Sequence, residues 1–151
     1  MSTKDFVLEH FLPYRVSLLS NTVSEGISVA YRNAHGLSVP EWRVIAVLGR
    51  FPGHTASEVV QQTAMDKVTV SRAVRKLIDK GLVEHSDKAT DRRRQPLKLT
   101  PEKGKVLFDE IVPQALHYEQ QLVAALGDRE LSQFNRSIDK LIKAAQELNA
   151  R

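Results

Sequence analysis

The chain has 151 residues, enough for one domain, and its 42% hydrophobic and 26% charged residues are ordinary for a globular protein. It lacks cysteine, an apolar run of membrane-spanning length and the apolar segment of a signal peptide, so we expect a cytoplasmic protein without disulfides or thiolate zinc sites. The net charge of +4 is uneven, because residues 66–105 hold 12 basic against 6 acidic residues and the rest holds 10 against 12. That local excess is typical of a protein that binds a phosphate backbone, although a solvated lysine-rich surface would give the same count.

The first third of the sequence predicts one long amphipathic helix. Its apolar residues recur every three or four positions from Leu12 to Tyr31. Pro13 is tolerated near the start of such a helix. We expect the helix to stop near His35 and Gly36, because glycine readily adopts the left-handed conformation that ends helices.

Two capping boxes open the next two helices. Ser38 precedes Glu41 by three residues, and Thr55 precedes Glu58 by the same spacing. In a capping box each side chain of the pair accepts a hydrogen bond from the other residue's backbone N–H. The first box predicts a helix that ends before the segment FPGH, and the second predicts a short helix that ends near Gln62.

A fourth helix follows after three residues. Asp66 is its predicted cap, Lys80 its approximate end and Gly81 its terminator. Its predicted inner face consists of Val70, Val74, Leu77 and Ile78.

Two short strands are predicted next, in the segments LVEHS and PLKLT. The residues between them, Asp87–Gln95, are polar apart from Ala89 and dense in arginine. A hairpin with a long basic tip is therefore expected.

The last third predicts two long helices. Thr100 is expected to cap the first, with Pro101 at its first position and a kink at Pro113, and Asp128 is expected to cap the second after a stop at Gly127. The apolar residues that the second helix should bury are Leu131, Phe134, Ile138, Leu141, Ala145 and Leu148. Such stripes exceed what the small compact part can cover, which predicts a homodimer.

These elements predict a mainly α protein built as a winged helix-turn-helix with flanking dimerisation helices. We expect a single domain over residues 1–151, with the winged lobe at 38–100 and the dimerisation helices in 1–37 and 101–151.

Candidate nucleic-acid contacts lie in two places. The outward face of the fourth helix presents Lys67, Thr69, Ser71, Arg72, Arg75 and Lys76. The hairpin tip presents Asp91, Arg92, Arg93 and Arg94. Arg72 could bind a guanine edge in the major groove, and the Asp91 carboxylate could orient Arg93 toward a minor groove. The alternative for the helix face is that these are ordinary solvated polar residues. The alternative for the hairpin tip is that Asp91 only relieves repulsion among three adjacent arginines.

No catalytic arrangement, metal-ligand spacing or phosphate-binding glycine loop is present in the sequence, so we expect neither an enzyme nor a cofactor. A small organic effector could bind between the helices, and the candidate lining residues are Tyr14, Arg15, Tyr31, Trp42 and Tyr118. Core packing and surface ion pairs are the simpler roles for these residues.

The segments DKVTVSRAVRKLIDKGLV and DRRRQPLKLTPEKG, within a similarity that runs through most of the chain, resemble the MarR (multiple antibiotic resistance regulator) family. The resemblance implies a homodimeric repressor, less often an activator, that releases a pseudopalindromic operator when an organic ligand binds. It implies base contacts from Thr69, Ser71, Arg72 and Arg75, and a minor-groove contact from Arg93 oriented by Asp91. The absence of cysteine departs from the oxidation-sensing branch of that family.

The expected partners are therefore double-stranded operator DNA, a second copy of the chain and an effector, with aromatic acids and acyl-CoA esters as candidate classes. No membrane partner is expected. Two other functions stay open at this point: a winged-helix module that binds protein or RNA, and a constitutive DNA-binding dimer without an effector.

Overall fold

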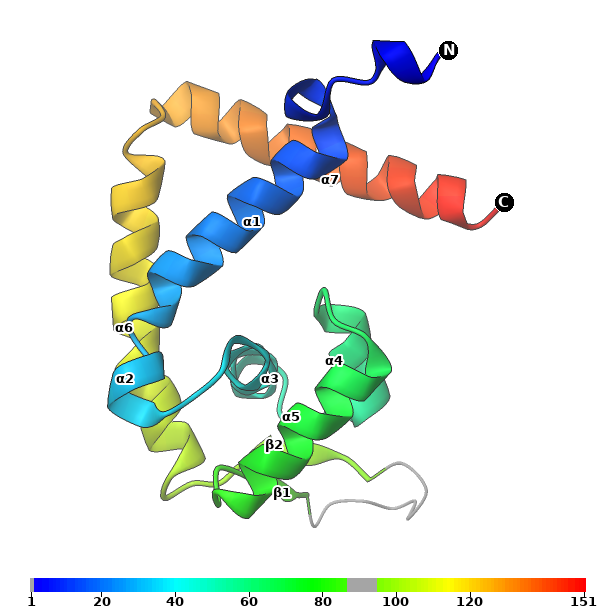
Figure 1. Cartoon of the computed structure of the whole chain (residues 1–151). Coiled ribbons are helices and arrows are strands. Elements are labelled where there is room, and N and C mark those ends of the chain that lie inside the picture. The colour runs from blue at the N-terminus through cyan, green and yellow to red at the C-terminus, as the bar shows by residue number, and fades with distance from the viewer. Residues whose placement is uncertain (1, 87–94) are drawn as a thin grey trace. The chain divides into compact units, whose positions relative to one another are not determined.

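Helices dominate the computed structural model, which describes residues 2–86 and 95–151 (Figure 1). Within this part, two short 3-10 turns, η1 (Thr3–Asp5) and η2 (Leu8–His10), come first. The α-helices are α1 (Leu12–Ser28), α2 (Arg32–His35), α3 (Val39–Arg50), α4 (Ala56–Gln62), α5 (Lys67–Asp79), α6 (Gly104–Val123) and α7 (Asp128–Asn149). Strands β1 (Val83–His85) and β2 (Leu97–Leu99) pair antiparallel. The predicted mainly α fold class is confirmed.

The chain divides into two compact units within α6. Met1–Ala115 forms the first unit, and Leu116–Arg151 forms the second. The first contains η1 to β2 and the start of α6, and the second contains the end of α6 and all of α7.

The core of the first unit is built around α3. Val44, Ile45 and Leu48 are at most 1% exposed. This helix packs against α4, α5 and β2, whose buried side chains complete the same apolar cluster. Burial of this cluster supplies the main driving force that holds the helix-turn-helix and the strands together.

Local start signals place the middle helices as predicted. Both capping boxes form, with the backbone N–H of Glu41 donating to the Ser38 hydroxyl and that of Glu58 donating to the Thr55 hydroxyl, each at 3.3 Å. The carboxylates of the two glutamates accept from the backbone N–H of Ser38 and Thr55 in return. Because these bonds satisfy N–H groups that a helix cannot pair internally, α3 and α4 begin where the sequence indicates.

The strands are held on both sides of β2. One neighbour is β1, in a register that places Val83 opposite Leu99. On the other side, the backbone of Leu97 accepts from Gly53 at 2.8 Å and donates to His54 at 2.9 Å. The base of the wing is therefore anchored to the loop between α3 and α4.

Helix α6 starts later than predicted. Pro101 is not its first residue, because residues 101–103 form a turn and α6 begins at Gly104. Thr100 does not flank the helix, but its hydroxyl still accepts from the N–H of the first helical residue, Gly104, at 2.9 Å and donates to the Gly81 carbonyl at 2.7 Å. A Cβ at Gly104 would lie 2.0 Å from the Leu82 carbonyl oxygen, so only glycine fits at this crossing. The helix then continues through Pro113 to Val123.

The predicted single N-terminal helix is wrong at its C-terminal end. The chain leaves α1 after Ser28 and starts the short α2 at Arg32, which ends at Gly36 with φ of +64°, as expected for that glycine. The backbone N–H groups of Ala30 and Tyr31 bond to carbonyls three residues back, which tightens the chain. This change of geometry places the Tyr31 ring in the core, where it is 1% exposed.

One further prediction needs correction. Gly127, not Asp128, is the cap residue of α7, because the helix already includes Asp128. The apolar stripe of α7 is exposed in the single chain, with Leu141 at 50% and Ile138 at 37%, and its predicted burial in a homodimer stays a prediction. The described part of this single chain leaves that stripe accessible to another surface.

Candidate nucleic-acid interface

Two helices joined by a short turn form the centre of the candidate site. Helix α4 ends at Gln62 and α5 begins at Lys67, and they pack against each other and against α3 (Figure 1). On the inner side of α5, Val70, Ala73, Val74 and Leu77 are buried. This is the predicted helix-turn-helix, and α5 takes the place of its recognition helix, the helix that enters the DNA groove in such motifs.

The N-terminus of α5 is fixed by its cap. The Asp66 carboxylate accepts hydrogen bonds from the backbone N–H of Thr69 at 2.8 Å and from its hydroxyl at 3.0 Å. These bonds favour the charged form and hold the pKa of Asp66 below its ordinary value. The Thr69 hydroxyl, a predicted DNA contact, thus donates within the turn and has only its acceptor side left for other partners.

The outward face of α5 carries the other predicted contacts. Ser71, Arg72 and Arg75 are exposed, and their spacing of one, three and four residues puts them on adjoining positions opposite the buried side. Lys67 and Lys76 are exposed at the margins of this face. The structure therefore brings together, on one helix, five of the predicted basic and polar residues with their side chains accessible.

Val68 is a residue of this face that the sequence reasoning missed. It is 59% exposed and lies four residues before Arg72, on the same side of α5. The sequence signal for it was an apolar, β-branched residue that stands among polar residues on the outer face of an amphipathic helix. Apolar side chains in this position suit the methyl group of thymine in a major groove.

An acidic residue and a groove mark the C-terminal end of the face. Asp79 is exposed four residues after Arg75, where a carboxylate would repel phosphate. An open groove of about 250 Å³ between α4 and α5 is lined by Ala56, Ser71, Val74, Arg75, Ile78 and Asp79. Ile78, predicted to be an inner-face residue, is 36% exposed in this groove, and Ala73 takes the inner position instead.

The wing contributes its anchored base to the described structure. Glu84 and Lys98 face each other across the two strands and form an ion pair with 3.4 Å between the charged atoms. The predicted tip contacts, Asp91, Arg92, Arg93 and Arg94, lie outside the described residues.

Within the first unit, the predicted effector residues do not form one cluster. Tyr31 and Trp42 stack with ring centroids 5.6 Å apart. Burial raises the pKa of Tyr31, although the nearby charges of Arg32 and Arg43 act in the opposite direction. Arg43 also donates to the Ser24 hydroxyl at 3.2 Å, so the guanidinium whose charge acts on Tyr31 is held by a second contact.

Two further effector candidates of the first unit lie apart from this stack. Tyr14 and Arg15 line a separate surface groove along α1 with Leu18, Leu19 and Thr22. Tyr118 belongs to the second unit, Leu116–Arg151. The structure thus brings together Tyr31 with Trp42, and Tyr14 with Arg15.

Residues 2–86 and 95–151 contain neither a metal-binding cluster nor a membrane-spanning helix. No group of three or more histidine, aspartate or glutamate side chains in this range is placed to hold a metal ion. No helix in the same range is both long and apolar enough to cross a membrane.

Comparison with known proteins identifies the family. A sequence model of the MarR family matches residues 35–94. The HTH-type transcriptional regulator PetP of Rhodobacter capsulatus is 30% identical over 103 residues, which are 68% of this chain and 61% of PetP. An HTH-type transcriptional repressor of Mycobacterium tuberculosis is 26% identical over 132 residues, 87% of this chain and 91% of the repressor.

Solved structures share the fold over nearly the whole chain. A MarR/EmrR family transcriptional regulator from Acinetobacter sp. ADP1 has a TM-score of 0.85 and 25% identity, covering 94% of this chain and 99% of that one. BpsR of Bordetella bronchiseptica, whose DNA binding is regulated by 6-hydroxynicotinic acid, has a TM-score of 0.76 and 21% identity over 90% of this chain and 96% of its own. These relatives are named as transcriptional regulators and not as enzymes, which agrees with the prediction that this chain is not an enzyme. The chain belongs to the MarR family of transcriptional regulators.

Proposed function

We propose that the protein is a repressor that binds a pseudopalindromic operator as a homodimer and releases it when a small organic effector binds. One observation carries the DNA-binding part of this proposal. The exposed face of α5 presents Ser71, Arg72 and Arg75 on a capped helix in the recognition position of a helix-turn-helix.

The residues of α5 divide by the chemistry they offer to DNA. Arg72 has the forked donors that fit the O6 and N7 atoms of guanine, and Val68 offers a methyl contact to thymine. Lys67 and Lys76, at the margins, are point charges suited to phosphates. In the wing, the family resemblance assigns Arg93 to a minor groove and Asp91 to its orientation, with Arg92 and Arg94 adding positive charge.

The dimer is supported by the exposed stripe on α7. Leu131, Phe134, Ile138, Leu141, Ala145 and Leu148 are separated by alternating steps of three and four residues. This spacing is that of the a and d positions of a coiled-coil seam, which packs against an equivalent seam on another helix. In the first unit, apolar side chains of α1, such as Leu18 at 53% exposed and Leu19 at 48%, are also available for contact with a second copy.

The effector part of the proposal is supported by the Tyr31–Trp42 stack. An aromatic ligand would match these rings, and a carboxylate on it would match the nearby Arg43, whereas Arg32 is already paired with the Glu25 carboxylate at 3.1 Å. BpsR responds to an aromatic acid of this kind. Of the two candidate classes, these contacts favour aromatic acids over acyl-CoA esters.

Enrichment from random nucleic acid pools tests the proposed function. The full-length protein is offered a random double-stranded DNA pool and, in parallel, a random RNA pool, and the retained molecules are sequenced after several cycles. We expect one enriched DNA motif and no RNA motif. Enrichment of an RNA motif, or retention without any motif, would contradict the proposal and favour a different partner for the winged helix.

A further inference from the structure

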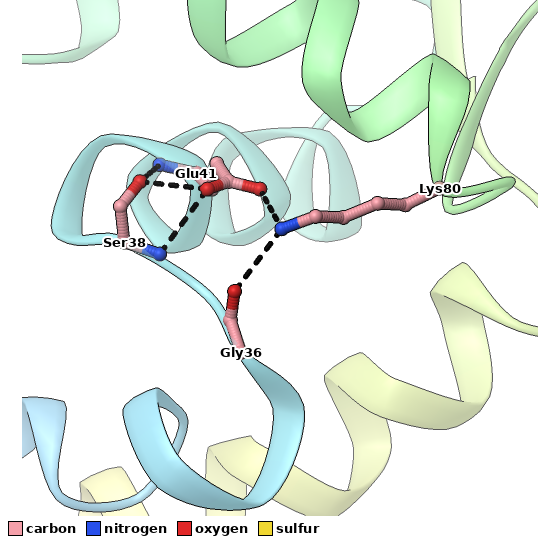
Figure 2. Close-up of polar contacts among 4 residues, drawn as sticks. All are labelled: Gly36, Ser38, Glu41 and Lys80. Carbon is pink, nitrogen blue, oxygen red and sulfur yellow. Dashed lines mark hydrogen bonds and ion pairs between the residues drawn. The ribbon is translucent and has the colours of Figure 1, made fainter.

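A buried carboxylate links the end of α5 to the start of α3. Glu41 is 3% exposed. Figure 2 shows one of its oxygens, Oε2, facing Lys80 Nζ at 2.6 Å, while the other, Oε1, accepts from the Ser38 hydroxyl at 2.9 Å and from the Ser38 backbone N–H at 3.3 Å. The Lys80 ammonium also donates to the Gly36 carbonyl at 3.1 Å. We call these four residues the Glu41 cluster.

The Glu41 cluster joins the end of α5 to the junction between α2 and α3, about 40 residues earlier in the sequence. Lys80 is the residue that follows α5, Gly36 ends α2, and Ser38 caps α3. The capping box needs only Ser38 and Glu41, and it uses only one oxygen of the carboxylate. The second oxygen is therefore left to fix the position of the α5 C-terminus.

Apolar packing between α3 and α5 does not by itself fix the angle between the two helices. Burial of apolar side chains is non-directional, so packed helices can shift slightly relative to each other. A charge-assisted hydrogen bond has a defined length and direction, and two of them from one ammonium define the position of the helix end. We infer that Lys80 and Glu41 are positioning residues that set the angle at which the recognition helix α5 meets DNA.

A small rotation of α5 about its C-terminal end at Lys80 causes a large displacement of its N-terminal end. Lys80 and Val68 are separated by twelve residues, about 18 Å of helix, so a rotation of about 10° at Lys80 would move Val68 by about 3 Å. Base-edge hydrogen bonds need atoms placed well within 1 Å, whereas contacts to phosphate tolerate larger shifts. Loss of the pair should therefore weaken sequence-specific binding more than non-specific binding.

This inference rests on the proposed function, and its test compares two DNA probes. The first probe is the duplex that the wild-type protein enriches from the random pool, and the second is a scrambled duplex of equal length and composition. The variants are Glu41→Gln, Lys80→Met and the double variant. Gln at position 41 can still accept the hydrogen bonds from Ser38, so the cap of α3 is kept.

We expect Glu41→Gln and Lys80→Met each to bind the enriched duplex about tenfold more weakly and the scrambled duplex no more than about twofold more weakly, because a charge-assisted hydrogen bond is lost. The double variant should lose no more than Lys80→Met alone, since that variant already removes both the bond to Glu41 and the bond to Gly36. Lys105→Met is the matched control. It removes an equal charge from an ion pair with Asp109 on α6, and should change binding to both duplexes alike and by about twofold or less.

Glu41→Gln separates positioning from simple charge. It makes the protein more positive, so electrostatics alone predicts tighter binding to DNA, whereas positioning predicts weaker binding to the enriched duplex. Equal or tighter binding of the enriched duplex by Glu41→Gln would overturn the inference, as would an equal loss on both duplexes by Lys80→Met with a flatter salt dependence. Failure of the wild-type protein to enrich any duplex would instead contradict the proposed function itself.

Discussion

Arg72 is the residue at which specific and non-specific binding should separate most clearly. If its guanidinium binds a guanine edge, Arg72→Ala should cost about 1–3 kcal/mol on the enriched duplex and much less on a scrambled one. Lys76→Ala is the control on the same helix, and it should weaken both complexes similarly and reduce the salt slope by about one counterion per protomer. Equal losses on both duplexes for Arg72→Ala, measured by fluorescence anisotropy across a salt series, would remove its base-reading role.

Glu41 should make folding stability depend on acid pH. Burial tends to raise the pKa of this carboxyl, but the hydrogen bonds from Lys80 and Ser38 outweigh that effect and lower it below the ordinary value. A carboxyl with a lowered pKa in the folded state adds stability above its unfolded pKa, and this stability is lost as the pH falls through the folded pKa.

The free energy of unfolding, measured by urea titration at a series of pH values, should therefore differ most between wild type and Glu41→Gln near neutral pH. The difference should shrink as the pH falls below the ordinary range of a glutamate. A difference that is constant with pH would show that the carboxylate charge does not contribute.

At the scale of whole elements, local signals predicted where α3, α4 and α5 begin, but not where α6 and α7 begin. Ser38, Thr55 and Asp66 cap their helices as expected, because a cap depends only on residues three positions away. The break after Ser28 follows from burial of Tyr31 against Trp42, a tertiary contact that the helical periodicity does not contain.

The candidate site shows the same division. The basic face of α5 was predictable from the helical periodicity, since its buried residues recur every three or four positions and leave the polar residues on the opposite side. The link from Lys80 to Glu41 was not, because 39 residues separate the two partners. Sequence spacing identified Glu41 as a capping residue and left its second oxygen without a role.

The α7 stripe gives a prediction about assembly. Leu141→Asp places a carboxylate in the seam and should dissociate the dimer, because an unpaired charge in an apolar interface is strongly unfavourable. Gln146→Asp is the control, since it adds the same charge to α7 outside the stripe. Sedimentation velocity at micromolar concentration reports the oligomeric state, and a folded monomer for the wild-type protein would contradict the assigned interface.

At the scale of the whole molecule, effector binding and DNA release should be linked. A ligand can shift the equilibrium only if it binds one conformation of the dimer more tightly than the other. Trp42 is the single tryptophan of the chain, so its fluorescence reports directly on the stack. Aromatic acids that quench this fluorescence should also release the enriched duplex, and a series in which quenching and release follow different compounds would place the effector elsewhere.

The proposed function requires that two copies of α5, one from each protomer, bind one face of the same duplex. Hydroxyl-radical footprinting of the wild-type protein on the enriched duplex tests it most directly, because the protected positions map onto the DNA helix. A dimer of this kind should protect two half-sites related by a pseudo-two-fold axis, with centres one helical turn, or roughly 34 Å, apart. A single protected half-site, or two half-sites without that symmetry, would contradict operator binding by a homodimer.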